Sequence, residues 1–444
     1  MSRALPRAAE VGVIGACTLF VMALVPGAAL PQAAEPRVAA SSPVTRAQEG
    51  GTLSALVAEL DRQNADLQAA RREIDVRTAR VAPAGALPDP ILSASTMAGF
   101  ARPPFFPSAT TPNGFNQIGI AQPLPARGTR GLRTAVAAAD LEAGRQDYAA
   151  QRLTLIADLK TTYLDYLLAV HSLEIVADNQ ALLDQLRQVA ETRFSVGRGL
   201  QQDVIKAQVD ISLLLERMTI LEQQRAIAVV RLNELLRRPI DAPAPPIDRY
   251  RAEPVPATLV ELQQRIEVQS PALQREAHLV ERSRSAVALA RLGLRPEFMV
   301  GVSAARFAGD MPWMYGLDVS VSLPVFAARK QRPMIVEASA ALDQQEQVRE
   351  GMRSRASGEV ARAFLAAQSA DRLSTLYTDS VIPQARLALE SSLAAYQVGS
   401  LDFLSVLTNF DAVFAAQVSQ LEQQTRRDQA LVQLEPYVGT TFVR

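Results

Sequence analysis

The chain contains few side chains of the kinds that carry out enzymatic chemistry. Its two histidines, His171 and His278, stand singly in helical stretches, where packing or surface exposure is commoner than a role as a base or metal ligand. The single cysteine, Cys17, lies in an apolar stretch near the N-terminus. Without clustered histidines, carboxylates or thiols, a transition-metal site has little support. We therefore expect no enzyme, no metal and no cofactor.

The glycine-rich segments do not match nucleotide-binding loops. Gly197 and Gly199 begin like a dinucleotide fingerprint, but Gln202 stands where the third glycine would be and no strand precedes them. We expect this segment to be a turn. Because the sequence has no GK[ST] phosphate loop either, the chain does not hydrolyse ATP, and any transport must use energy supplied by another protein.

The charge balance and the N-terminus bear on partners and location. The 46 basic and 46 acidic residues cancel, which argues against a nucleic-acid partner. Arg3 and Arg7 precede an apolar stretch from Val11 to Val25, and small residues follow it, as is typical of a secretory signal peptide cut near Ala34. Residues 14–17 resemble a lipobox, so lipidation of Cys17 is an alternative, which the apolar residues after it disfavour. No later run approaches the roughly 18 apolar residues of a membrane helix.

The chain repeats one plan twice. A shift of 206 positions places Thr52-Leu53 on Thr258-Leu259, and a shift of 202 places Val196-Gly197 on Val398-Gly399. Between the copies, a segment with six prolines precludes a long helix and marks a linker. The predicted parts are a signal peptide at residues 1–34, a first repeat at 35–236, a Pro-rich linker at 237–257 and a second repeat at 258–444.

Long helices are predicted in each repeat. Residues 132–196 and 334–398 each make a rod of about 100 Å at 1.5 Å per residue. Medium helices are expected at about 52–86 and 203–237. Apolar side chains spaced by three and four residues predict coiled-coil packing, and they are Ile156, Leu159, Tyr163, Tyr166, Val170, Leu173 and Ala177, followed by Val204, Ala207, Ile211, Leu214, Met218 and Leu221. Pro383 predicts a kink or break in the second long helix, where the first repeat has Ala181.

Four stretches read as membrane-length strands: Pro90–Phe100, Phe115–Leu124, Pro296–Phe307 and residues 315–326. In the last, Leu317, Val319, Val321 and Leu323 form an apolar face that we expect to contact lipid, whereas Asp318, Ser320 and Ser322 form a polar face. Four strands cannot close on themselves, and an open edge is not tolerated in lipid, so several chains would have to combine. The alternative is a pair of ordinary hairpins that cap a soluble helical bundle.

Several motifs in fixed order resemble one family. They are QPLP (Gln122 to Pro125), RFSVGRGLQQDV (Arg193 to Val204), SLPVF (Ser322 to Phe326), VIPQA (Val381 to Ala385) and AYQVGSLDFLSVL (Ala395 to Leu407). Together with the signal peptide and the duplication, they resemble the TolC family of outer-membrane efflux proteins over nearly the whole mature chain. Residues 85–92, GALPDPIL, resemble the strand entry of members that serve heavy-metal pumps of the RND type.

The resemblance implies a mainly α fold with a small β part. A homotrimer would form a 12-stranded barrel in outer-membrane lipid and a long coiled-coil α-helical tunnel in the periplasm, with the linker and C-terminus in an equatorial belt. It implies a passive exit duct of a tripartite efflux system, which docks to a periplasmic adaptor and an inner-membrane RND-type pump and exports small molecules or metal ions. The alternative is a periplasmic coiled-coil structural or adaptor protein without a channel, which would lack paired membrane-length hairpins.

The resemblance also assigns candidate sites near the two Val-Gly breaks. It implies adaptor docking at tips formed by Val196, Gly197, Arg198, Leu200, Val398, Gly399 and Leu401, whose side chains we expect to have no core to bury them. It implies further that Asp203 and Tyr396 pair between helices and hold the entrance shut; a solvated carboxylate and a packing tyrosine are the alternatives. Leu401 stands in place of a locking arginine, and Ser405 and Thr408 in place of two pore-narrowing aspartates, so an acidic ring is not expected unless Asp402 turns inward.

Overall fold

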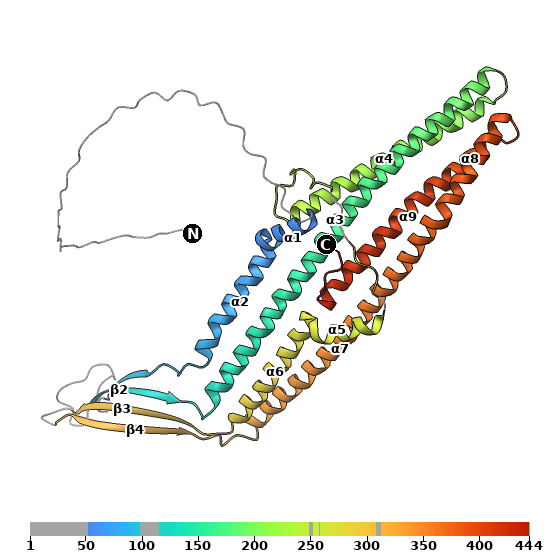
Figure 1. The fold of residues 1–444 in the computed structure, drawn as a ribbon. Coiled ribbons are helices and arrows are strands. Elements are labelled where there is room, and N and C mark those ends of the chain that lie inside the picture. Colours follow the sequence, from blue (N-terminus) through green and yellow to red (C-terminus); the bar gives the residue numbers. More distant parts are fainter. Residues whose placement is uncertain (1–51, 98–114, 248–251, 257, 308–311, 444) are drawn as a thin grey trace, which may run out of the picture. The chain divides into compact units, whose positions relative to one another are not determined.

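The computed structural model describes residues 52–97, 115–247, 252–256, 258–307 and 312–443 (Figure 1). The predictions for the signal peptide and for Cys17 lie outside these residues. The fold is mainly α-helical with one small antiparallel sheet, as predicted. Among the described helices, none combines the length and apolar character needed to cross a membrane.

The two halves of the chain have the same order of elements. The first half contains α1 (Thr52–Gln63), α2 (Ala65–Ala84), β1 (Ile91–Met97), β2 (Phe115–Leu124), α3 (Thr129–Ser195) and α4 (Gln201–Leu235). The second contains α5 (Leu259–Gln269), α6 (Pro271–Leu292), β3 (Glu297–Phe307), β4 (Met314–Ser322), α7 (Gln331–Leu376), a π-helical turn η1 (Tyr377–Val381), α8 (Ile382–Val398) and α9 (Phe403–Val438).

The medium helix predicted at residues 52–86 is in fact two helices. Asn64 separates α1 from α2 and caps α2, because its side-chain oxygen accepts hydrogen bonds from the N–H groups of Asp66 and Leu67 at 3.0 and 3.1 Å. Its Nδ2 donates to the carbonyl of Leu235 at the end of α4. Ser270 separates α5 from α6 at the equivalent position, 206 residues later. Both repeats therefore contain the same break.

The two long helices differ at the position of Pro383. The 67-residue α3 is regular, whereas α7 and α8 are joined by η1, in which the N–H of Ile382 donates to the carbonyl of Tyr377 five residues earlier. Proline has no N–H to donate, and the wider turn shifts the bonding by one residue just before it. The helix therefore does not break at Pro383; its bonding pattern changes in the preceding turn.

The predicted apolar seams form two buried clusters. One joins α1, α2 and the middle of α3 to α5, the start of α6, α7, the last part of α4 and the last part of α9. The other joins the last part of α3 to the first part of α4, α8 and the first part of α9. Ile156, Leu159, Tyr163 and Tyr166 are buried as predicted, but Ala177 is exposed and the preceding Val176 is buried in its place. The seam shifts because a straight α-helix has 3.6 residues per turn and drifts from a 3.5-residue repeat.

A single sheet is formed by the four strands in the order β1-β2-β3-β4, and each neighbouring pair is antiparallel. The two hairpins predicted from the sequence are therefore joined side by side through β2 and β3. Figure 1 shows the strands leading directly into the helices that flank them in sequence.

The linker and the C-terminus are held together. Ala252 forms an isolated antiparallel bridge with Val443, and the N–H of Glu253 donates to the carbonyl of Phe442 at 2.9 Å. Glu435 of α9 accepts the N–H groups of Phe442 and Val443 at 2.8 and 3.0 Å. Lys160 of α3 donates to the same buried carboxylate at 2.6 Å. This charged pair therefore anchors the end of the chain to the longest helix.

Candidate functional site

One face of the sheet is apolar across several strands. Val319 of β4 lies opposite Val300 of β3. Val302 of β3 lies between Leu317 of β4 and Ile120 of β2. The exposed fractions of Leu317, Val319, Val321 and Leu323 are 72%, 60%, 45% and 64%. These large side chains have no core to cover them within the chain, as a lipid-facing surface requires.

The opposite face of the sheet is small and polar. Ser303 of β3 donates a hydrogen bond of 2.9 Å to Asp318 of β4. Gly301 lies so close to β2 that a side-chain carbon there would lie 3.0 Å from Cβ of Ala121. The sheet therefore separates an apolar surface from a polar one, although both faces of β4 are exposed in the single chain.

The two Val-Gly breaks, which we call the tip turns (residues 196–200 and 398–402), have the same backbone geometry. Gly197 and Gly399 have left-handed φ values of 72° and 83°. The N–H of Gly197 donates to Phe194 and that of Arg198 to Arg193. The second turn repeats this Schellman pattern 202 residues later. Glycine is favoured at both positions because other residues rarely adopt this conformation.

The side chains around the tip turns are exposed, with one exception. Val196, Leu200 and Val398 are 64%, 65% and 82% exposed, and Arg198 is also exposed. Leu401, which was predicted to have no core to bury it, is half-buried and packs against the second apolar cluster. It lies just before α9, where the chain returns to the bundle, so that prediction was wrong for Leu401.

The structure brings together the two residues predicted to close the entrance, which we call the lock pair (Asp203 and Tyr396). The hydroxyl of Tyr396 in α8 donates to a carboxylate oxygen of Asp203 in α4 at 3.1 Å. Tyr396 is 3% exposed, and its ring packs against Phe403 with centroids 5.3 Å apart. Burial and the neighbouring carboxylate raise the pKa of Tyr396 to about 12, so the hydroxyl remains a donor at neutral pH.

Arg193 completes this cluster, and its role was not predicted from the sequence. Its guanidinium lies over the ring of Tyr396, 4.5 Å from the centroid, and its Nη2 donates to the carbonyl of Arg198 at 3.2 Å. Such a cation–π contact contributes about 0.5–2 kcal/mol. Arg193 therefore links the first tip turn to the lock pair, and α8 is held from two sides.

Comparison with known proteins identifies the family of this chain. The model of the outer membrane efflux protein family matches residues 56–236 and 262–440. The chain belongs to this family. It is therefore an outer membrane protein of the efflux channel class, and members of this class are channels and not enzymes.

The relatives of this efflux protein include exporters and solved channels. It is 27% identical over 321 residues to the pyoverdine export outer membrane protein OpmQ of Pseudomonas putida, covering 70% of this chain and 67% of the relative. OpmQ of Pseudomonas aeruginosa is 25% identical over 311 residues, which cover 67% of this chain and 64% of that relative. Each match therefore spans about two thirds of the relative. A solved structure of CusC superposes with a TM-score of 0.76 at 18% identity, covering 89% of this chain and 96% of that one, and shows a shared fold.

Beyond the lock pair, the efflux protein has polar side chains near the second tip turn. Asp402 is exposed and accepts a hydrogen bond from Ser405. Asp210 of α4 and Asp411 of α9 line a groove of about 440 Å³, and this pairing was not predicted from the sequence. Desolvation raises the pKa of both carboxyls, Asp210 raises that of Asp411 further, and Lys206 lowers both.

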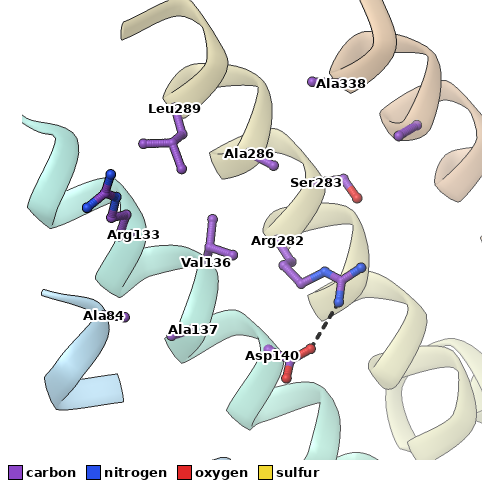
Figure 2. Close-up of a pocket in the computed structure, with 11 residues that line it drawn as sticks. Ala84, Arg133, Val136, Ala137, Asp140, Arg282, Ser283, Ala286, Leu289 and Ala338 are labelled. Atoms are coloured by element: carbon purple, nitrogen blue, oxygen red, sulfur yellow. Dashed lines mark hydrogen bonds and ion pairs between the residues drawn. The ribbon is translucent and has the colours of Figure 1, made fainter. Parts of the chain in front are cut away.

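Another groove lies at the other end of the helices, where α2, α3, α6 and α7 approach the sheet (Figure 2). It has a volume of about 580 Å³, and five of its eleven lining residues are alanines. Arg282 of α6 donates to Asp140 of α3 at 3.1 Å across it, and Arg133 stands on α3 nearer its start. Within the described residues, no three histidine, cysteine or acidic side chains gather as metal ligands would.

Proposed function

We propose that three copies of this chain form the passive outer-membrane exit duct of a tripartite efflux system. The observation that carries the proposal is the sheet, whose apolar face spans neighbouring strands and remains exposed in the single chain. Within the described sheet, β1 and β4 each pair on one side only. Joining three sheets edge to edge would satisfy both edges in lipid.

The helices would then extend into the periplasm and enclose a tunnel. At their far ends, the tip turns present Val196, Leu200 and Val398 to solvent beside the cationic Arg198. We propose that these residues dock a periplasmic adaptor, which connects the duct to an inner-membrane RND-type pump. In this arrangement the lock pair would keep the entrance closed until the adaptor binds.

The cargo that we propose is a small organic molecule. The two curated relatives are named for pyoverdine export, and this favours an organic cargo over the metal ions that the segment at residues 85–92 suggests. Cells that lack this chain should then accumulate the exported compound in the periplasm, whereas their tolerance of metal ions should be unchanged. Lost metal tolerance with normal export of organic compounds would reverse this choice.

Two substitutions on adjacent residues of β4 test the membrane placement. Val319→Lys puts a cation on the apolar face, where it costs about 2–4 kcal/mol near the middle of a bilayer. Ser320→Lys puts the same charge on the polar face. We expect Ser320→Lys trimers in isolated outer membranes, with conductance in planar bilayers, and little or no inserted Val319→Lys protein.

The opposite ranking of the two variants would reverse the assignment of the faces. A wild-type chain that is released with the soluble periplasmic fraction and shows no conductance would favour the alternative of an adaptor without a channel.

The tip turns are tested by Gly197→Leu and Gly399→Leu, with Gly351→Leu inside α7 as the matched control. Gly351 has no left-handed φ, so the control adds the same side chain without backbone strain. We expect all three variants to form trimers, and only the two tip variants to lose export. If export survives both tip substitutions, the adaptor docks elsewhere.

A further inference from the structure

The junction between the sheet and the long helices carries a group of exposed cations, which we call the basic collar. Three stand at the start of α3 and three at the start of α7: Arg127, Arg130, Arg133, Arg329, Lys330 and Arg332. Arg291 and Arg295 add two more at the end of α6. The first turns of α3 and α7 contain no acidic residue, so the charge is not balanced within those turns.

The basic collar gathers cations that have no acidic partner in one place. Among the described residues, none of these eight cations lies within ion-pair distance of a carboxylate. Farther along the helices, Arg77, Arg152 and Arg427 bind acids on neighbouring helices. In the collar, Arg130 donates to the carbonyl of Gly85 at 2.7 Å and so caps the end of α2.

The starts of α3 and α7, which carry the two halves of the collar, line one groove. Its volume is about 410 Å³, and its lining includes Arg133 of α3, Gly293 after α6, Gln331 of α7 and two acids, Glu297 of β3 and Glu337 of α7. The helices that begin here, α3 and α7, and those that end here, α2 and α6, have opposite dipoles that offset one another. The net positive charge at this junction therefore comes from side chains.

The collar follows directly on the apolar face of the sheet. Leu323, Val325 and Phe326 are 64%, 75% and 74% exposed, and only two alanines separate Phe326 from Arg329 and Lys330. Apolar and aromatic side chains followed by cations are the order found where a protein leaves the hydrocarbon of a bilayer and enters its headgroup layer.

We propose that the basic collar binds the headgroups of anionic phospholipids in the leaflet that faces the helices. This inference rests on the proposed function, which places the sheet in the membrane. The phosphates of such lipids complement exposed cations that have no carboxylate partner in the chain, and each cation near an anionic surface increases binding about fivefold at low salt. The collar thereby fixes the depth at which the sheet ends and the helices begin.

The test compares lipid retention by detergent-extracted trimers. Trimers are equilibrated with equal amounts of phosphatidylglycerol and phosphatidylcholine at low salt, and the lipids that remain bound are quantified. One variant combines Arg329→Gln, Lys330→Gln and Arg332→Gln. The control combines Arg349→Gln, Arg355→Gln and Arg372→Gln, which removes the same charge from exposed positions of α7 without an ion pair in the described structure.

We expect wild type and control to prefer phosphatidylglycerol, and the collar variant to lose that preference at least fivefold. Salt at 0.5 M should weaken the preference of the wild type, because charges at a surface are screened. If the collar variant does not form trimers, Arg127→Gln with Arg133→Gln on α3 serves as a second variant, with the same expected loss.

Three results would overturn the inference. Equal retention of the two lipids by the wild type would show that no anionic lipid is bound. Loss of trimers in both collar variants would show that the cations pair with a neighbouring copy. Altered ion selectivity with unchanged lipid preference would place them in the pore. In each case, wild-type trimers that still conduct would leave the proposed function intact, whereas a wild type without conductance would contradict the proposed function itself.

Discussion

Removal of the hydroxyl group of Tyr396 is the sharpest test of how the entrance closes. Tyr396→Phe keeps the ring that packs against Phe403 and Arg193 and deletes only the donor to Asp203. Asp203→Ala deletes the acceptor. If the lock pair holds α4 and α8 together in the closed state, both substitutions should raise the resting conductance of reconstituted trimers.

The expected magnitude follows from the chemistry of the contact. A hydrogen bond to a charged group contributes about 1.5–3 kcal/mol. Loss of about 1.5 kcal/mol shifts the ratio of closed to open states about tenfold for each copy. Because a trimer contains three such contacts, we expect the open probability to rise at least tenfold. The double variant should add little to either single one, since both remove the same bond.

Single-channel recordings in planar bilayers measure this effect. Tyr377→Phe in η1 is the matched control, because within the described residues its hydroxyl has no hydrogen-bond partner. It should conduct like the wild type. If Tyr396→Phe and Asp203→Ala also conduct like the wild type, the lock pair does not close the entrance, and Tyr396 is only a packing residue.

Other predictions concern stability and pH. Lys160→Met leaves Glu435 buried without its ammonium partner and should lower the free energy of unfolding by about 3 kcal/mol in denaturant titrations. Arg231→Met removes one partner of an exposed pair and should change the free energy of unfolding by less than about 1 kcal/mol. The pKa of Tyr396 is raised to about 12, so the hydrogen bond of its hydroxyl group stabilises the closed state fully below pH 10 and is lost as pH rises toward 12. The conductance of the wild type should therefore rise between pH 10 and 12. Tyr396→Phe should lack this transition. Gly197→Ala should cost about 1–2 kcal/mol in the same denaturant titrations despite open space around it, because its φ is 72°; an unchanged midpoint would contradict the argument.

The strands were predictable because alternation along a strand decides which face each side chain occupies. The alternation at Leu317, Val319 and Val321 identified the apolar face of β4 without any knowledge of its neighbours. The pairing of β2 with β3 was not predictable, because it joins segments from different repeats. The breaks at Asn64 and Ser270 were missed because apolar residues recur on both sides of each break. Both are good helix N-caps, and the proline after Ser270 was a readable signal.

The contacts around the lock pair show where prediction from the sequence ends. The short sequence separation of Asp203 and Tyr396 from their tip turns predicted that both residues lie at the same end of the helices. Their hydrogen bond joins residues 193 positions apart and depends on how α4 packs beside α8. The position of Arg193 over the ring depends on the same packing, and no spacing along one helix reports it. Pro383 likewise indicated a disturbance correctly, but not that a π-turn would absorb it.

The duplication explains why the lock pair occurs once in each chain and not twice. Because the two tip turns are equivalent, a second lock pair would require a hydroxyl donor and an acid at the positions 202 residues away from Tyr396 and Asp203. The counterpart of Tyr396 is Phe194, which has no hydroxyl, and the counterpart of Asp203 is Ser405, which has no charge. Arg193 corresponds to Ala395. The repeats have therefore kept the same backbone turn while only one interface retained a donor, an acid and a cation. In a trimer, three such contacts would hold the entrance, and its opening would follow three-fold symmetry.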